Sequence, residues 1–356
     1  LPMRIEMGLL SLEVDQYAGK GQRAPSISSI VTAARRLEAL GVDGAMMPEA
    51  GYDPFLPLML AAEHTNRITL GTNVAIAFPR SPLVVAQMAW DLQRYSGGRF
   101  QLGLGTQVKG HNERRYATPW MAAPGPRLRE YIQCLRAMFQ TFQNGTQPTY
   151  FKGEHYQFTL MPPFFNPGPI EHPRVPIYIA VVNKYMARLA GELCDGLRLH
   201  PIATFTYTRE VVRPAIEAGA RKAGRQLSDI DIVGAPFLAI GRDAKEIEAA
   251  TLALKQRIAF YASTRSYHSV LEFHGWSGVG LKLHQLSIEG KWQEMAGLIT
   301  DDILREFAII GTYDELTSQL KERCGGIFSS VLLDLPPQLR ADEAKVREII
   351  QALRQP

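Results

Sequence analysis

The sequence is poor in cysteine and lacks any long apolar run. Its 356 residues include only three cysteines, Cys134, Cys194 and Cys324, which are far apart and odd in number. This usage is typical of a reduced intracellular protein, so we expect a cytoplasmic location. No run reaches the roughly 18 apolar residues of a spanning helix, and the N-terminal residues lack the apolar core of a signal peptide. We therefore expect no membrane partner and no secretion signal.

Strong charge and the usual metal or hydrolase motifs are also missing. The net charge is +4 and the basic residues are scattered, whereas a nucleic-acid-binding protein carries a clustered basic stripe. The eight histidines form neither an HxxxH nor an HExxH pattern, and no GxSxG sequence is present. These absences exclude a recognisable zinc site and a hydrolase elbow, so we expect no metal and no nucleic-acid partner. A mildly basic protein suits a small anionic ligand.

A repeated pattern of helix, glycine stop and buried strand is the main positive signal. Tyr95-Ser-Gly-Gly-Arg-Phe100 reads as a helix that ends at two glycines, and the apolar run that follows reads as a strand buried on both faces. That strand opens into the polar, basic segment Thr106–His111. In α/β proteins, ligands bind at the loops that follow the carboxyl ends of strands.

The whole chain contains eight such strand candidates with helices between them. They are Ile5–Leu10, Gly44–Pro48, Ile68–Val74, Phe100–Gly105, Ile177–Ala180, Gly196–His200, Ile232–Gly241 and Ser330–Leu335. Eight alternating strands and helices predict a (β/α)8 TIM barrel, an α/β fold, as a single domain over residues 3–356. The alternative is an open doubly wound sheet, but Gly103-Leu-Gly105 lacks the third glycine of a dinucleotide fingerprint.

Two segments are longer than the connections that a minimal (β/α)8 barrel needs, and we interpret both as insertions. Residues 149–176 contain a predicted hairpin, Thr149–Thr159, and then a proline-rich loop. Residues 263–310 form a second, lid-like segment between the seventh strand and the last helices. Long segments of this kind are usually lids or binding loops.

The order of the motifs resembles luciferase-like flavin and deazaflavin oxidoreductases, the bacterial luciferase superfamily. The motifs are Gly41-Val-Asp-Gly44, Asp53-Pro-Phe55, Arg67-Ile-Thr-Leu-Gly-Thr72, Arg80-Ser-Pro82, Ser96-Gly-Gly-Arg-Phe100, Leu102-Gly-Leu-Gly105 and Ala187–Gly196. The run Gln107–Arg115, with Pro119-Trp120 and Val182-Asn183, resembles the branch that depends on the deazaflavin coenzyme F420. The resemblance implies a luciferase-like barrel with insertions, the cofactor ring at its carboxyl mouth, and a homodimer.

The resemblance also places cofactor-binding residues after the third and fourth strands. Related proteins often have a non-proline cis peptide that ends the third strand against the ring, and Gly71, Thr72 and Asn73 match that place. After the fourth strand, the side chains of Thr106 and Gln107 offer hydrogen bonds to a ring edge or ribityl chain. Lys109 adds positive charge beside them.

A phosphate site is predicted after the fifth strand. The backbone at Val182 and Asn183 opens a helix, whose first N–H groups bind anions, and Lys184 adds a positive charge. The other basic residues near the mouth, Arg114 and Arg115, suit an anionic cofactor tail. A surface ion pair with Glu113 is the alternative, and for Arg115 we favour that ion pair.

Two residues are catalytic candidates. Glu49 ends the second strand, where related deazaflavin enzymes often have Asp-His; here Ala50 replaces that histidine. Glu49 could act as acid or base, because an apolar environment raises a carboxyl pKa, or it could cap a backbone turn. His200 ends the sixth strand and is either catalytic or structural.

We therefore predict a deazaflavin-dependent oxidoreductase that transfers a hydride to or from a small organic substrate. An FMN-dependent monooxygenase of the same fold, which uses reduced flavin and oxygen, is the first alternative. A barrel that binds flavin without catalysis is the second. The basic residues at the predicted rim favour the deazaflavin because of its anionic polyglutamate tail.

Overall fold

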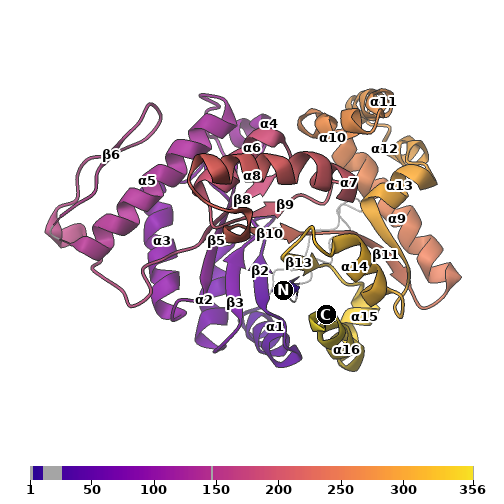
Figure 1. The fold of residues 1–356 in the computed structure, drawn as a ribbon, viewed down its shortest axis with the longest axis horizontal. Helices are drawn as coiled ribbons and strands as arrows, with labels where there is room; N and C mark the ends of the chain where they lie inside the picture. Colours follow the sequence, from indigo (N-terminus) through magenta and orange to yellow (C-terminus); the bar gives the residue numbers. More distant parts are fainter. Residues whose placement is uncertain (1–2, 11–25, 146, 356) are drawn as a thin grey trace. The chain divides into compact units, whose positions relative to one another are not determined.

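The computed structural model describes residues 3–10, 26–145 and 147–355 (Figure 1). Its contacts divide the chain into two compact units, each of which is described by itself. The first unit contains residues 6–180 and 192–197, and the second contains residues 1–5, 181–191 and 198–356. None of the helices in the described residues is long and apolar enough to cross a membrane.

The strands of the main sheet confirm the predicted barrel. They are β1 (Arg4–Gly8), β2 (Gly44–Met47), β3 (Thr69–Thr72), β4 (Ala75–Ile76), β5 (Phe100–Gly105), β8 (Ile177–Val181), β9 (Gly196–Leu199), β10 (Asp231–Gly234) and β13 (Ser330–Leu333). Their hydrogen-bonded order is β3-β2-β1-β13-β10-β9-β8-β5-β4, and the additional β3–β5 pairing closes the sheet. Because β4 continues the position of β3, eight parallel positions result, as a (β/α)8 barrel requires.

The described part of the first unit has five α-helices before the hairpin. They are α1 (Ile27–Leu40), α2 (Phe55–Glu63), α3 (Pro82–Tyr95), α4 (Lys109–Arg114) and α5 (Pro124–Asn144). Local sequence sets their ends: the Ser81 hydroxyl accepts from the Val84 N–H at the start of α3. After α3, Gly97 and Gly98 adopt φ of 63° and 87°. This confirms the predicted double-glycine stop, since those angles favour glycine.

The second unit is richer in helices. Its helices are α6 (Lys184–Leu193), α7 (Phe205–Tyr207), the π-helix η2 (Thr208–Val212), α8 (Arg213–Lys222), η3 (Leu227–Asp229), α9 (Ala244–Ala262), η4 (Arg265–Tyr267), α10 (His268–Phe273), α11 (Ser277–Ile288), α12 (Trp292–Met295), η5 (Ala296–Leu298), α13 (Asp301–Phe307), α14 (Leu316–Cys324), α15 (Pro337–Ala341) and α16 (Glu343–Arg354). The helices α10 to α13 occupy most of the segment interpreted as a lid-like insertion. The single-domain prediction and the insertion boundaries stay predictions.

The prediction of one continuous strand over Ile232–Gly241 is wrong. It divides into β10 and β11 (Phe237–Gly241), and β11 pairs in parallel with β12 (Ala308–Thr312) in a separate two-stranded sheet. Pro236 lies at the break, and proline has no N–H with which to continue a ladder. The last residues of the 263–310 segment therefore belong to β12.

The predicted hairpin is present beside α5 in the first unit. Strands β6 (Phe151–Lys152) and β7 (Gln157–Phe158) pair antiparallel, and the short helix η1 (Pro163–Phe165) follows them. Figure 1 shows this hairpin at the outer edge of the unit, in magenta next to α5.

Candidate active site

Glu49 lies at the centre of a hydrogen-bonded network in the first unit. Its Oε2 accepts from the backbone N–H of Ile76 at 2.7 Å and from Nη1 of Arg80 at 2.7 Å. Its Oε1 accepts from the hydroxyl of Tyr116 at 3.0 Å. The carboxylate side chain is only 7% exposed. Both oxygens are thus occupied, which is the backbone-capping arrangement considered from the sequence; a role in proton transfer stays a prediction.

Two arginines extend this network. Arg80 also donates to Asp53 at 3.3 Å and to the Ile76 carbonyl at 3.0 Å. Burial disfavours its charged form, but the carboxylates of Glu49 and Asp53 outweigh burial and raise the Arg80 pKa. Arg115 donates from Nη2 to the Tyr116 hydroxyl at 2.8 Å and to the Ala50 carbonyl at 3.0 Å.

The phenol of Tyr116 therefore lies between a carboxylate and a guanidinium. Burial and the nearby Glu49 charge raise the Tyr116 pKa, so the hydroxyl keeps its proton at neutral pH. Because the same Arg115 nitrogen donates to both groups, Arg115 links this hydroxyl to the carbonyl of Ala50, the residue that follows Glu49.

The end of β3 departs from regular strand geometry at the predicted place. The peptide bond between Asn73 and Val74 is cis, one bond beyond the predicted segment 71–73. The Thr72 hydroxyl accepts from the Gly103 N–H at 2.8 Å and donates to the Gly103 carbonyl at 2.6 Å. This side chain thereby bridges β3 to β5 between the β3–β5 and β4–β5 pairings. Gly71 packs closely as well, since a Cβ there would lie 2.8 Å from Met46 Sδ.

The loop after β5 is organised by its own residues. Gln107 adopts a φ of 55°, and its Oε1 accepts from the Val108 N–H at 2.9 Å. Asn112, which is fully buried, donates from Nδ2 to the carbonyls of Thr106 and Val108 at 3.0 and 3.1 Å. Lys109 is exposed, and its Nζ lies 3.9 Å from a Glu113 carboxylate oxygen. No sequence pattern distinguishes Asn112 from the other polar residues of this loop, so its role is visible only in the structure.

The remaining predicted residues belong to the second unit. Asn183 accepts from the Met186 N–H at 3.0 Å through its side chain, so it caps α6. Asn183 and Lys184 are exposed, and Val182 is half-buried. The start of α6 therefore lies where a phosphate site was predicted, although one of its N–H groups already has a partner.

His200, also in the second unit, packs against two tyrosine rings. Its ring lies 4.7 Å from the rings of both Tyr261 and Tyr267. Nδ1 accepts from the Ile202 N–H at 3.1 Å. Burial, with a smaller contribution from the Arg257 charge, lowers the His200 pKa to about 3. The imidazole is thus neutral at neutral pH, with its proton on Nε2.

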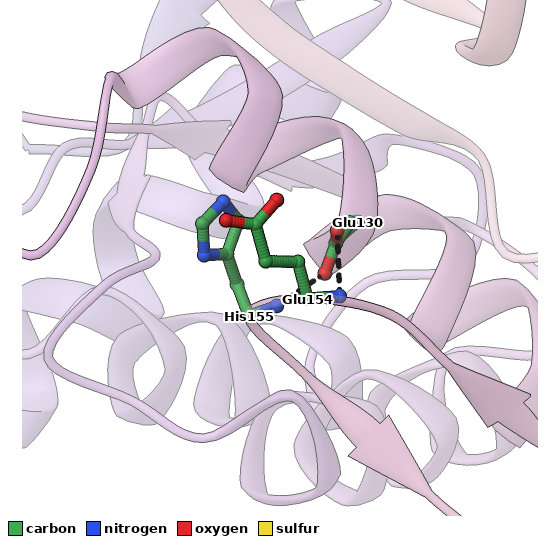
Figure 2. Close-up of side chains that lie close together, drawn as sticks. All are labelled: Glu130, Glu154 and His155. Atoms are coloured by element: carbon green, nitrogen blue, oxygen red, sulfur yellow. Dashed lines mark hydrogen bonds between the residues drawn. The ribbon is translucent and has the colours of Figure 1, made fainter.

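A cluster of Glu130, Glu154 and His155 joins α5 to the hairpin turn (Figure 2). The Glu130 carboxylate accepts from the N–H groups of Glu154, His155 and Tyr156 at 3.0, 2.7 and 3.3 Å. Burial works against ionisation, but these backbone hydrogen bonds lower the Glu130 pKa. The contacts explain the cluster as a cap on the turn, and we infer no metal site from it.

The comparisons with known proteins agree with this architecture. The family described as luciferase-like monooxygenase matches residues 6–328. An uncharacterised protein of Mycobacterium tuberculosis is 42% identical over 90% of this chain and 93% of its own length. The 5,10-methylenetetrahydromethanopterin reductase of Archaeoglobus fulgidus is 30% identical over 74% of this chain and 76% of its own length.

Solved structures show the same fold. The coenzyme F420-dependent tetrahydromethanopterin reductase of Methanopyrus kandleri matches with a TM-score of 0.74 at 21% identity, over 100% of this chain and 98% of that one. The EDTA monooxygenase of Chelativorans matches with a TM-score of 0.72 at 16% identity, over 99% of this chain and 94% of that one. The Archaeoglobus relative and both solved structures bear the names of reductases or monooxygenases. The chain belongs to the luciferase-like family of oxidoreductases.

Proposed function

We propose that the protein is a coenzyme F420-dependent oxidoreductase that transfers a hydride between the deazaflavin and a small organic substrate. The observation that carries this proposal is the 30% identity, over three quarters of the chain, to a methylenetetrahydromethanopterin reductase. A second relative, 28% identical over 80% of the chain, bears the name of a putative coenzyme F420-dependent oxidoreductase.

We propose that residues of the first unit bind the planar ring and the anionic tail of the cofactor. Gly71, Thr72 and Asn73 would lie against the ring, and Thr106 and Gln107 would contact its edge or side chain. The side chain of Lys109 is 65% exposed and its amino group lies 3.9 Å from Glu113, so we propose that it binds a phosphate or glutamate of the cofactor. When bound, the deazaflavin supplies or accepts the hydride.

The residues of the second unit would bind the phosphate. We propose this role for the backbone at Val182 and Asn183, with Lys184 adding charge. The exposure of Asn183 and Lys184 at the start of α6 supports it, because backbone N–H groups in the first turn of a helix attract anions.

The proton that accompanies the hydride needs a residue of this chain. We propose that Glu49 takes part in its transfer through the Tyr116 hydroxyl, which donates to it at 3.0 Å. His200 is the second candidate, acting as a neutral imidazole. We also propose that the protein forms a homodimer and is located in the cytoplasm.

An FMN-dependent monooxygenase is the competing function, and the description of the matching family favours it. Titration of the full-length protein with coenzyme F420 and with FMN, followed by cofactor fluorescence, separates the two. We expect F420 to bind more tightly than FMN, and its binding to weaken as salt is raised. Tighter binding of FMN at every salt concentration would replace the proposal with the monooxygenase. Tight F420 binding without turnover of any tested alcohol, imine or enoate would favour a non-catalytic barrel.

A further inference from the structure

Asn112 connects the two ends of the loop that contains α4. This residue of α4 is fully buried. Its Nδ2 donates to the carbonyls of Thr106 and Val108 at 3.0 and 3.1 Å. Its backbone carbonyl accepts from the Thr118 N–H at 2.9 Å. One residue therefore ties the segment that enters α4 to the segment that leaves it.

These hydrogen bonds lie next to two residues with a left-handed backbone. Gln107, which follows Thr106, has a φ of 55°. Ala117, which precedes Thr118, has a φ of 50°. A residue with a Cβ is strained at these angles, so the surrounding structure has to hold it there. The hydrogen bonds of Asn112 supply such a restraint at both positions.

The side-chain oxygen of Asn112 contributes nothing to this arrangement. Oδ1 is buried, and no described residue donates to it. A buried carbonyl oxygen without a hydrogen bond destabilises the folded state, whereas an apolar side chain of similar shape, such as leucine, avoids that cost. The function of the amide at this position therefore lies in its two N–H donors.

The segment that Asn112 holds includes Tyr116. The Thr118 hydroxyl donates to the Tyr116 carbonyl at 3.1 Å, which joins this residue to the tied end of the loop. The Tyr116 hydroxyl donates to Glu49 at 3.0 Å and accepts from Nη2 of Arg115 at 2.8 Å. A hydrogen bond is lost beyond about 3.5 Å, so a displacement of the segment by about 1 Å breaks both contacts.

We propose that Asn112 is a positioning residue, which places the Tyr116 hydroxyl on the Glu49 carboxylate through the backbone of the loop. Asn112, Tyr116 and Glu49 all belong to the first unit. The role of the hydroxyl in proton transfer rests on the proposed function. The placement of the hydroxyl does not, because it depends on contacts within this chain alone.

The pKa of Tyr116 reports this placement without any cofactor. Burial and the Glu49 carboxylate raise that pKa, while the charges of Arg115 and Arg80 act in the opposite direction. NMR titration of the full-length protein with ¹³C-labelled tyrosine measures it, and Tyr116→Phe assigns the signal. We expect the Tyr116 pKa to fall toward the ordinary value of 10.0 when Asn112 is replaced, because the hydroxyl then leaves its buried place beside Glu49.

Two variants of Asn112 and one control make the test specific. Asn112→Leu removes both donors at a similar volume. Asn112→Ser is the milder change, since a serine hydroxyl in a helix can donate to the carbonyl four residues earlier, here that of Val108, and leaves Thr106 untied. Asn166→Leu is the matched control. Asn166 also donates through Nδ2 to a backbone carbonyl, that of Thr141 at 3.0 Å, and it lies outside the Glu49 network.

A lower Tyr116 pKa in the Asn112 variants, with the wild-type pKa in Asn166→Leu, supports the positioning role. An unchanged Tyr116 pKa in either folded Asn112 variant overturns it, and so does an equal fall in Asn166→Leu, because that would reflect general loosening. The pH profile of turnover with F420 then tests the link to catalysis, and we expect it to shift in the Asn112 variants. A lower Tyr116 pKa in these variants, without F420 turnover by the wild type, supports the placement while contradicting the proposed function.

Discussion

The Glu49 carboxylate and the Arg80 guanidinium, 2.7 Å apart, together hold both polar backbone groups of Ile76. Glu49 accepts from the N–H, and Arg80 donates to the carbonyl. This ion pair fixes the strand segment that follows Asn73 and Val74, and it ties the same segment to Tyr116. A residue expected to act in chemistry therefore also determines local structure.

We first predict that Glu49→Gln lowers the free energy of unfolding by about 1–3 kcal/mol. The substitution removes the charge that Arg80 faces and weakens two further hydrogen bonds. Urea unfolding at neutral pH measures the loss. This stability cost comes in addition to any effect on turnover through the proposed role of Glu49 in proton transfer.

Glu113→Gln is the matched control for this prediction. The Glu113 side chain is 42% exposed and lies 3.9 Å from Lys109, so its loss should change stability by less than about 0.5 kcal/mol. Equal stability of Glu49→Gln and Glu113→Gln would show that the Glu49 network contributes nothing measurable.

The second prediction concerns the close packing at Gly71. An added Cβ would lie 2.8 Å from Met46 Sδ and 3.1 Å from the Gln101 carbonyl oxygen. Gly71→Ala should therefore destabilise the protein by about 1–3 kcal/mol, because the backbone of β5 has to move. Gly51→Ala is the control, since no atom lies within 4 Å of the added Cβ. Thermal unfolding of both variants checks the prediction, and equal midpoints would contradict it.

The third prediction is a pH dependence that comes from His200. Its folded pKa, about 3, lies below the ordinary value of 6.5. The folded state therefore binds fewer protons than the unfolded state as pH falls through this window. The stability that neutral His200 contributes is present above pH 6.5 and is lost as the pH falls toward 3.

His200→Asn keeps a hydrogen-bond acceptor but does not titrate. We expect its free energy of unfolding to fall less steeply than that of the wild type between pH 6.5 and pH 4. Denaturant unfolding at several pH values gives both slopes. Parallel slopes would mean that His200 titrates normally in the folded protein.

The fourth prediction tests the basic loop after β5. Lys109→Ala and Arg114→Ala should each weaken F420 binding severalfold at low salt. The difference from the wild type should shrink at high salt, because the screening length falls from about 10 Å at 0.1 M to about 3 Å at 1 M. Fluorescence titration at the two salt concentrations checks this. Unchanged affinity in both variants at low salt would remove the loop from cofactor binding.

The sequence by itself determined the order of the elements and many of their ends. Helix ends and buried strands depend on a few neighbouring residues: glycines that end helices, Ser81 before Pro82, and short apolar runs. These local signals can be recognised without knowledge of the fold. The position of the irregular segment after β3 followed from the family resemblance. The break within Ile232–Gly241 also had a local signal, Pro236, although an uninterrupted strand was predicted there.

Only the tertiary structure decided how the charged side chains are paired. Glu49 meets Arg80 and Tyr116, which lie 31 and 67 residues away in the chain, and Arg127 lies over Phe78 rather than beside an acid. Periodicity assigns a residue to a face or a strand end, but it does not select its partner among many acids and bases. That selection depends on loop paths such as the one from Gln107 to Pro124, because a hydrogen bond is made only within about 3.5 Å and at a suitable angle.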